Sequence, residues 1–279
     1  MVTVKPGYCP QAEDTSIETD VFEFALLRQR TNSDRALMSA AHTRSTRRLS
    51  ISGLKHRFPQ MVGEAFAQKV AQSFLGDHCP PNFFTATHEM TWIQDSIALA
   101  AILHEVFEQV QIDYYITGGV ASSTFGDPRA TRDLDVVLAI APLQLEQLVI
   151  ALEVHQFYVP GVEDVRSGRM KTLGVTHQPT ISRADLMMAG SEEFDLVKFK
   201  RRKLVEVIGA GAFYFASPED VVLNKLRWRQ QSQSDKQWRD VLGVLKVQGD
   251  TLDFDYLGEW SRQLGIEADL FQALMEAGL

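Results

Sequence analysis

The chain has 279 residues, of which 45% are hydrophobic and 23% are charged, and its formal net charge is −8. These values are ordinary for a soluble globular protein, and no apolar run approaches the roughly 20 residues of a membrane span, which argues against an integral membrane protein. The two cysteines, Cys9 and Cys79, lack metal-ligand spacing, and no apolar signal segment opens the chain. Both features favour a reduced, cytoplasmic location.

The charge is distributed unevenly along the chain. Residues 25–60 contain eight Lys or Arg and one acid, whereas the remainder contains 20 basic and 35 acidic residues, a net of −15. The overall negative charge argues against a protein that coats nucleic acid in general. The basic segment instead indicates a local anionic partner, or an internal docking surface for the acidic part of the chain.

The first part of the chain divides into two segments. Residues 1–20 combine proline and glycine with scattered acids and are expected to be disordered. Residues 21–80 have helical periodicity and are expected to form a basic N-terminal helical module. Thr31 is a predicted helix cap, Gly53 a predicted interruption, and a linker rich in glycine and proline ends the module.

The second part of the chain predicts an α/β core over residues 88–216 and a helical tail over residues 217–279 packed on that core. Ser217, followed by Pro, Glu and Asp, is a strong signal for the first helix of the tail. The predicted fold class is therefore α+β, a mixed β-sheet core with flanking helices. Within the core we expect a helix over 92–107, strands over 114–117 and 133–140, a helix from Pro142 to about 157, strands over 172–177 and 181–188, and a hairpin over 203–208 and 212–215.

Two short motifs in the core carry chemistry. Gly118 and Gly119 follow a strand and precede a helix, so that backbone and helix N-terminus can approach a phosphate. Asp133 and Asp135 are two residues apart on a strand, which places both carboxylates on one face. Adjacent carboxylates repel each other unless a cation lies between them, and their oxygens suit Mg²⁺ together with substrate phosphates.

This stretch resembles the nucleotidyltransferase superfamily that includes DNA polymerase β, kanamycin nucleotidyltransferase and the toxin enzymes of abortive-infection systems. The resemblance covers about residues 92–245 and is strongest to the bacterial toxin-like branch. It implies a nucleotidyltransferase-like fold that binds a nucleoside triphosphate with Mg²⁺ or Mn²⁺. The residues that carry it are Gly118, Gly119, Gly126, Arg129, Thr131, Asp133 and Asp135.

The resemblance also implies roles for individual residues. Asp133 and Asp135 would bind the metal, while Gly118, Gly119, Arg129 and Thr131 would bind the nucleotide or shape its approach. The family's third carboxylate, a general base or further metal ligand, matches Asp185 best, with Asp195 as a weaker candidate. In the helical tail Lys225 and Asp240 match the toxin-like branch, where such a lysine is thought to steady the nucleotide.

Each of these residues also has a purely structural alternative. Asp133 could cap a turn, and Asp135 could pair with Arg132 or Arg129. Asp185 could bind Arg183 or Lys198, Lys225 could lie on a solvated helix face, and Asp240 could form an ion pair within the tail. The basic run 198–203 could contact phosphate or be solvated. The four tryptophans, Trp92, Trp228, Trp238 and Trp260, are expected in the core.

The leading hypothesis is thus a metal-dependent nucleotidyltransferase that moves a nucleoside monophosphate to an acceptor hydroxyl. The acceptor is left open between RNA such as tRNA, a partner protein and a small molecule, and the resemblance suggests a toxin–antitoxin or defence system. One alternative is a non-catalytic protein of the same fold that binds a protein or RNA partner. Another is RNA binding through the basic helices, which would be strongly salt-dependent.

Overall fold

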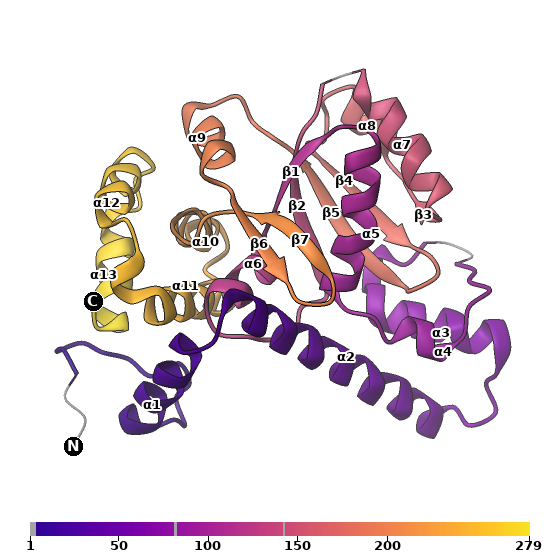
Figure 1. Cartoon of the computed structure of the whole chain (residues 1–279). Coiled ribbons are helices and arrows are strands. Elements are labelled where there is room, and N and C mark those ends of the chain that lie inside the picture. The colour runs from indigo at the N-terminus through magenta and orange to yellow at the C-terminus, as the bar shows by residue number, and fades with distance from the viewer. Residues whose placement is uncertain (1–3, 81–82, 142) are drawn as a thin grey trace.

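A single mixed sheet with helices on both sides forms the centre of the molecule (Figure 1), as seen in a computed structural model that describes residues 4–80, 83–141 and 143–279. The strand order is β3-β4-β5-β2-β1-β7-β6. The strands are β1 (Asp113–Thr117), β2 (Asp133–Ala139), β3 (Phe157–Tyr158), β4 (Thr172–His177), β5 (Ser182–Met188), β6 (Lys203–Val207) and β7 (Gly211–Phe215).

Helices precede the sheet, cover it and follow it. Pro142, which was expected to open α7, lies outside the described residues, and α7 itself begins at Gln144. The helices are α1 (Ile17–Arg28), α2 (Asn32–Arg57), α3 (Gly63–Leu75), α4 (Glu89–Trp92), α5 (Ser96–Gln109), α6 (Gly118–Phe125), α7 (Gln144–Val154), α8 (Val162–Arg166), α9 (Glu193–Arg201), α10 (Pro218–Ser232), α11 (Asp235–Gln248), α12 (Phe254–Gln263) and α13 (Glu267–Ala277).

The central strand β2 separates an apolar face from a polar one. Its alternate residues Leu134, Val136 and Leu138 are buried in the main hydrophobic core, which also contains the apolar face of α5. Asp133 and Asp135 therefore project from the opposite face, because successive side chains of a strand alternate. β2 pairs in parallel with β5 and antiparallel with β1. The predicted α+β class, a mixed sheet with flanking helices, is confirmed.

The long helix α2 begins at a capping box in which Thr31 and Asp34 exchange side-chain and backbone hydrogen bonds. Gly53 was expected to interrupt this segment, but it lies inside α2, where no atom lies within 4 Å of an added Cβ. A glycine within a helix costs only about 1 kcal/mol relative to alanine, which the length of the helix offsets. The helix ends at Arg57, two residues before Pro59.

One face of α2 carries a row of polar residues that binds distant backbone. Arg35 donates to the Thr124 carbonyl at 3.0 Å, and Ser39, four residues on, donates to the Arg129 carbonyl at 2.7 Å. Arg47, a further eight residues on, donates to the Thr180 carbonyl at 2.9 Å. Residues four apart lie on the same side of a helix, so this row faces the core along its whole length. In Figure 1 α2 correspondingly runs alongside α6 and the end of the β6–β7 hairpin.

Residues 4–20 were expected to have nothing to pack against, and here the structure differs. Asp20 is fully buried in α1 and pairs with the fully buried Lys246 of α11 at 2.7 Å. The Tyr8 hydroxyl also donates to Asp20, and the Lys246 ammonium donates to the Cys9 carbonyl at 2.6 Å. The partner of this segment lies more than 200 residues away, so local composition gives no sign of it.

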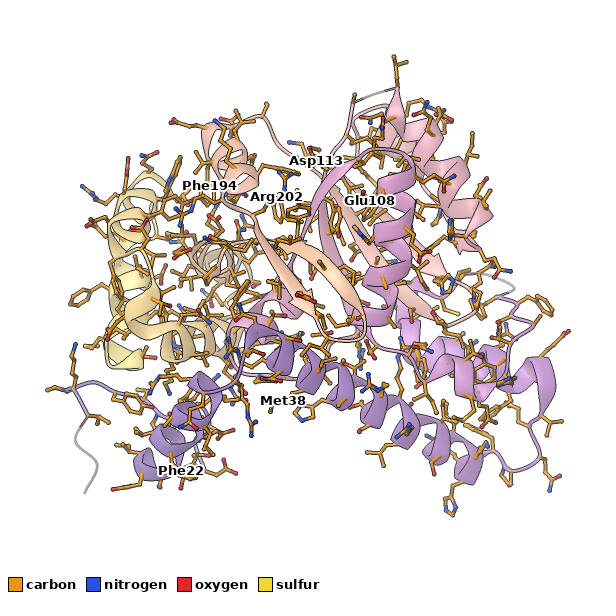
Figure 2. The ribbon with its side chains drawn as sticks, in the orientation of Figure 1. Phe22, Met38, Glu108, Asp113, Phe194 and Arg202 are labelled. Carbon is orange, nitrogen blue, oxygen red and sulfur yellow. The ribbon has the colours of Figure 1, made fainter. Side chains whose placement is uncertain are left out.

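Two further contacts fix the position of α9 and of the segment that follows it. Arg202, just before β6, donates to Asp113 at the start of β1 at 2.8 Å, and Figure 2 shows both side chains near the same edge. Phe194 of α9 is buried against Trp260 of α12, with ring centroids 4.8 Å apart. These contacts hold α9 beside the sheet. Within the described residues, no helix combines the length and apolar character needed to cross a membrane.

Candidate active site

Three aspartates project from neighbouring strands on the polar face of the sheet. Asp133 and Asp135 lie on β2, and Asp185 lies on β5, where it is the register partner of Asp135. Register partners on adjacent strands point to the same face, so the two predicted metal-binding residues and the predicted base form one acidic cluster. Asp195, the weaker candidate for the base, lies instead on α9 and pairs with Lys198 at 2.9 Å.

Gly118 gives the acidic cluster its close backbone neighbour. It has φ of +61°, a left-handed conformation that favours glycine, and a Cβ there would lie 1.8 Å from Oδ2 of Asp135. The backbone N–H of the next residue, Gly119, acts to lower the pKa of Asp135. The helix α6 starts at this point, and its free N–H groups suit an anion. The glycine pair and the start of α6 thus lie directly beside the Asp135 carboxylate.

Burial and mutual repulsion set the electrostatics of the pair. Burial raises the pKa of Asp135 to about 6, with Asp185 and Asp133 adding repulsion and Lys225 opposing the shift. Burial and repulsion from Asp185 also raise the pKa of Asp133. Among the described residues neither aspartate has an ion-pair partner, so the structural alternative in which Asp135 pairs with Arg132 or Arg129 is not the arrangement found.

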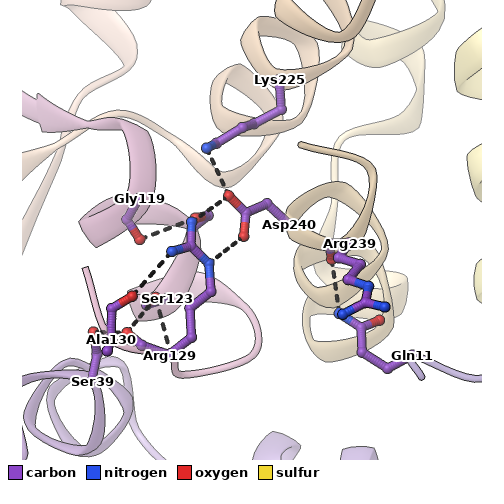
Figure 3. A network of polar contacts seen from close by, with 10 residues as sticks. Gln11, Ser39, Gly119, Ser123, Arg129, Ala130, Lys225, Arg239 and Asp240 are labelled. Carbon is purple, nitrogen blue, oxygen red and sulfur yellow. Dashed lines mark hydrogen bonds and ion pairs between the residues drawn. The ribbon is translucent and has the colours of Figure 1, made fainter. Parts of the chain in front are cut away.

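Arg129 and Lys225 both bind Asp240 rather than solvent (Figure 3). Lys225 of α10 donates to Oδ2 of Asp240 at 2.7 Å, and both residues are buried. Burial alone would raise the pKa of Asp240, but hydrogen bonds from Arg129 and the charge of Lys225 hold it below its ordinary value. This network fixes Lys225, which also opposes the shift of Asp135, at the edge of the acidic cluster.

Thr131 is buried and connects the loop between α6 and β2 to the helices α2 and α5. Its hydroxyl lies 2.9 Å from that of Ser96 at the start of α5, and its backbone N–H donates to the Thr43 hydroxyl of α2 at 3.2 Å. The Thr131 methyl group would lie 3.1 Å from a Cβ on Gly119. Thr131 therefore shapes the loop between Gly119 and Asp133, and the structure places Arg129 and Thr131 in this support rather than in open space.

Asp185 is paired within its own strand. Nη2 of Arg183 donates to its Oδ1 at 2.5 Å, as one of the structural alternatives expected. Gly174 on β4 makes room for this guanidinium, since a Cβ there would lie 2.6 Å from Nη2. The Nε atom of Arg183 is buried without a partner among the described residues. The pair keeps Asp185 on the polar face while compensating part of the negative charge of the cluster.

Two cavities meet at the acidic cluster, and Asp135, Lys225 and Gln237 line both. The first, of about 410 Å³, lies between β1, α9 and α10, and the second, of about 470 Å³, lies between α2, α3, the 129–133 loop and the start of α11. Both volumes fall in the range of about 300–1,000 Å³ found for small-molecule sites. The basic N-terminal helices therefore border one side of the acidic cluster, and the helical tail borders the other.

Two residues of the first cavity lie elsewhere than the sequence indicated, although Lys198 was named as part of the basic run 198–203 and as a possible partner of Asp185. Trp228 was expected in the core, but it is 58% exposed and lines the cavity. Leu226, two residues before it on α10, is buried, so the helical spacing of apolar residues assigned Trp228 to the wrong face of the helix. Lys198, part of the basic run 198–203, is buried beside Asp195 and lines the same cavity. Its burial in the cavity lining follows from the position of α9 beside the sheet, which the sequence did not predict.

The donor atoms at the cluster fit a hard divalent cation. Within residues 4–80, 83–141 and 143–279, no group of three or more His, Cys, Asp or Glu side chains is arranged to hold a metal by itself. Mg²⁺ does not require such a cage, because it usually takes one or two carboxylates, waters and substrate phosphates. Asp133 and Asp135, which have no ion-pair partner among the described residues, would provide the two carboxylates.

Comparisons with known proteins give weak similarities. No family model matches the chain, and no curated protein matches it in sequence. The crystal structure of an antigenic nucleotidyltransferase-like protein from Paracoccidioides brasiliensis is 18% identical, covers 64% of this chain and 92% of that chain, and has a TM-score of 0.44. The solution structure of the antibiotic-resistance factor ANT(2'')-Ia is 13% identical, covers 63% and 96%, and has a TM-score of 0.42. At these values neither similarity carries a functional conclusion.

Proposed function

We propose that this protein is a metal-dependent nucleotidyltransferase that moves a nucleoside monophosphate from a nucleoside triphosphate to an acceptor hydroxyl. The observation that carries the proposal is the cluster of Asp133, Asp135 and Asp185 beside the left-handed Gly118 bend. A cluster of carboxylates without cationic partners at two of its members is unfavourable by itself. It becomes favourable when a divalent cation lies between the carboxylates and the triphosphate.

Each residue of the cluster has a chemical task in this reaction. Asp133 and Asp135 would hold Mg²⁺ or Mn²⁺, which when bound neutralises charge on the triphosphate. The backbone at Gly118 and Gly119 would position the phosphates. Asp185, held by Arg183, would accept the proton of the acceptor hydroxyl. The hydroxyl oxygen then bonds to the α-phosphorus, the bond from that phosphorus to the bridging oxygen breaks, and pyrophosphate leaves.

The acceptor remains open between RNA such as tRNA, a partner protein and a small molecule. The second cavity supports a role for the N-terminal module, residues 21–80, in acceptor recognition, because α2 and α3 form one of its walls. A place in a toxin–antitoxin or defence system is part of the proposal on the resemblance of the motif alone. On the sequence patterns, we also keep the division into an N-terminal module over 21–80, a core over 88–216 and a tail over 217–279.

The test uses nucleoside triphosphates labelled at the α- or γ-phosphate, incubated with Mg²⁺, a cell extract and the protein. We expect α-label to enter one fraction of the extract and γ-label to appear only in pyrophosphate. Asp133→Asn should abolish the transfer, whereas Asp255→Asn, an exposed acid on α12 outside both cavities, should not. Transfer that survives in Asp133→Asn, or γ-label on the acceptor, would contradict the proposal.

The non-catalytic alternative makes a different prediction for binding. Calorimetry of nucleoside triphosphate with Mg²⁺ should show binding to the native protein that is lost in Asp133→Ala. Absence of metal-dependent binding in both proteins would favour a fold kept for protein or RNA contacts. RNA binding that is strongly salt-dependent and unaffected by the loss of Asp133 would favour the basic helices as the functional surface.

A further inference from the structure

One face of α10 lines the first cavity and is unlike the rest of that helix. Val222, Leu223 and Leu226 are buried in the main core. Asn224, Trp228 and Gln231 lie four and three residues apart, on one side of the helix, and line the cavity. Trp228 on this polar side is 58% exposed, whereas Trp260 of α12 is buried. The exposed Trp228 indole is therefore available for contact with a ligand in the cavity.

The residues of α10 that line the first cavity differ in character from one end of the cavity to the other. Lys225 lies at the end next to Gly118 and Asp135, whereas Trp228 lies about one helical turn, or roughly 5 Å, further along. Lys198 approaches from α9, where its ammonium lies 2.9 Å from Asp195 and 3.5 Å from Asn224. Arg227 is the third basic residue of the lining, and Asp135 is its only acid among the described residues. The cavity therefore combines an end at which Lys225 lies beside the acidic cluster with an aromatic end at Trp228.

From this arrangement we infer that the first cavity is the nucleotide pocket and that the Trp228 indole is the platform on which the nucleobase stacks. The inference rests on the proposed function, because it assumes that the triphosphate lies at the acidic cluster. With the phosphates at Gly118 and Asp135, the base is directed along α10 toward Trp228. The second cavity, on the opposite side of Asp135, is then left for the acceptor.

Stacking on an indole has a consequence for specificity. Every nucleobase presents a π-face, so stacking binds bases with little discrimination among them. The loss of the platform should therefore weaken all four nucleoside triphosphates by similar factors. Side chains that could hydrogen-bond a base edge at this end are Asn224 and Gln231, and they set whatever preference remains.

The experiment compares two probes, a nucleoside triphosphate and inorganic tripolyphosphate, each titrated with Mg²⁺ into the native protein and variants. Trp228→Ala should weaken nucleoside triphosphate binding about 5- to 100-fold and leave tripolyphosphate binding unchanged. Trp228→Phe should retain most of the affinity. Phe271→Ala, which removes a 70% exposed aromatic ring of α13 outside the cavity, serves as the matched control and should change neither.

The outcomes separate this inference from the function on which it rests. If the native protein binds nucleoside triphosphate with Mg²⁺ but Trp228→Ala binds it equally well, the platform is overturned and the proposed function stands. Equal weakening of both probes by Trp228→Ala would also overturn it, since the tryptophan would then act on the phosphate end. If the native protein binds neither probe, the proposed function fails, and this inference fails with it.

Discussion

Arg129 and Asp240, which are 111 residues apart in sequence, form a two-pronged ion pair in which Nε donates to Oδ1 and Nη2 to Oδ2, each at 2.7 Å. The same carboxylate accepts from Lys225. The pair connects the loop after Gly126 to the helical tail. Arg129 lies in the loop that leads into β2, which carries Asp133 and Asp135, and Lys225 lies on α10. The shared contact with Asp240 therefore fixes the position of this loop relative to α10.

Removing Arg129 should be costly because it leaves a buried carboxylate with one cation instead of two. We expect Arg129→Ala to lower the free energy of unfolding by about 3 kcal/mol. The measurement is chemical denaturation of metal-free protein. Arg166→Ala, which removes an exposed arginine paired with Glu146 and Glu163, is the control and should leave the midpoint almost unchanged. Equal midpoints for both variants would argue that Arg129 has no supporting role.

A methyl group at Gly118 should disturb both the backbone and Asp135. The left-handed conformation costs an alanine about 1 kcal/mol, and the added Cβ would also displace the Asp135 carboxylate. Gly118→Ala should therefore weaken Mg²⁺-dependent nucleotide binding by at least 10-fold in calorimetry. Gly168→Ala, at φ of +74° with no atom within 4 Å, imposes similar backbone strain without a clash. If it impaired nucleotide binding as much, general strain would be the cause.

The stability of the metal-free protein should depend on pH through Asp135. Burial, followed by repulsion from Asp185 and Asp133, raises its pKa from 3.8 to about 6 in the folded state. Between these two values the folded state binds more protons than the unfolded state. The contribution of Asp135 to stability is therefore greatest below pH 4, falls as the pH rises through about 6, and stays lower above it.

Asp135→Asn should remove this dependence and raise the stability of the metal-free protein at pH 7 by about 3 kcal/mol. Denaturation midpoints recorded from pH 4 to 7.5 check the expectation, with Asp255→Asn as a control that keeps the native slope. Saturating Mg²⁺ and nucleoside triphosphate should stabilise the native protein but not Asp135→Asn. A native slope retained in Asp135→Asn would show that other groups cause the pH dependence.

The N-terminal segment should detach when its buried lysine is removed. Lys246→Met leaves the Asp20 carboxylate fully buried and without its cation, which should cost about 3–5 kcal/mol. Limited proteolysis should then cleave within residues 4–16 faster than in the native protein. The double variant Lys246→Met with Asp20→Asn should recover part of the lost stability, because it leaves no unpaired charge. No recovery would indicate that packing, not the ion pair, holds the segment.

Much of the sheet could be predicted because its strands have clear local patterns. The strand over 172–177 was predicted with the bounds that β4 has, and β2 ends one residue earlier than expected. α9 was not predicted, since Glu193–Arg201 is short and mostly charged. Its helical structure depends on Phe194, which packs against Trp260 from a helix more than 60 residues away.

The candidate site shows the same division. The glycine pair and the two aspartates of β2 are close in sequence, and their geometry follows from a bend and a strand. The register that places Asp185 beside Asp135 depends on a parallel pairing across 50 residues, so sequence alone could rank it but not prove it. The binding of Arg129 to Asp240 and the exposure of Trp228 depend on how α10 and α11 pack, which no local pattern encodes.

The polar row on α2 limits how this molecule can be divided. Arg35, Ser39 and Thr43 hold the backbone of the segment that leads from α6 to Asp133, so the N-terminal helices act as part of the frame around the acidic cluster. A fragment starting after residue 80 would keep every motif residue and still lose the loop's shape. Any exchange of this helix between proteins would have to preserve its four-residue spacing of hydroxyl and guanidinium groups.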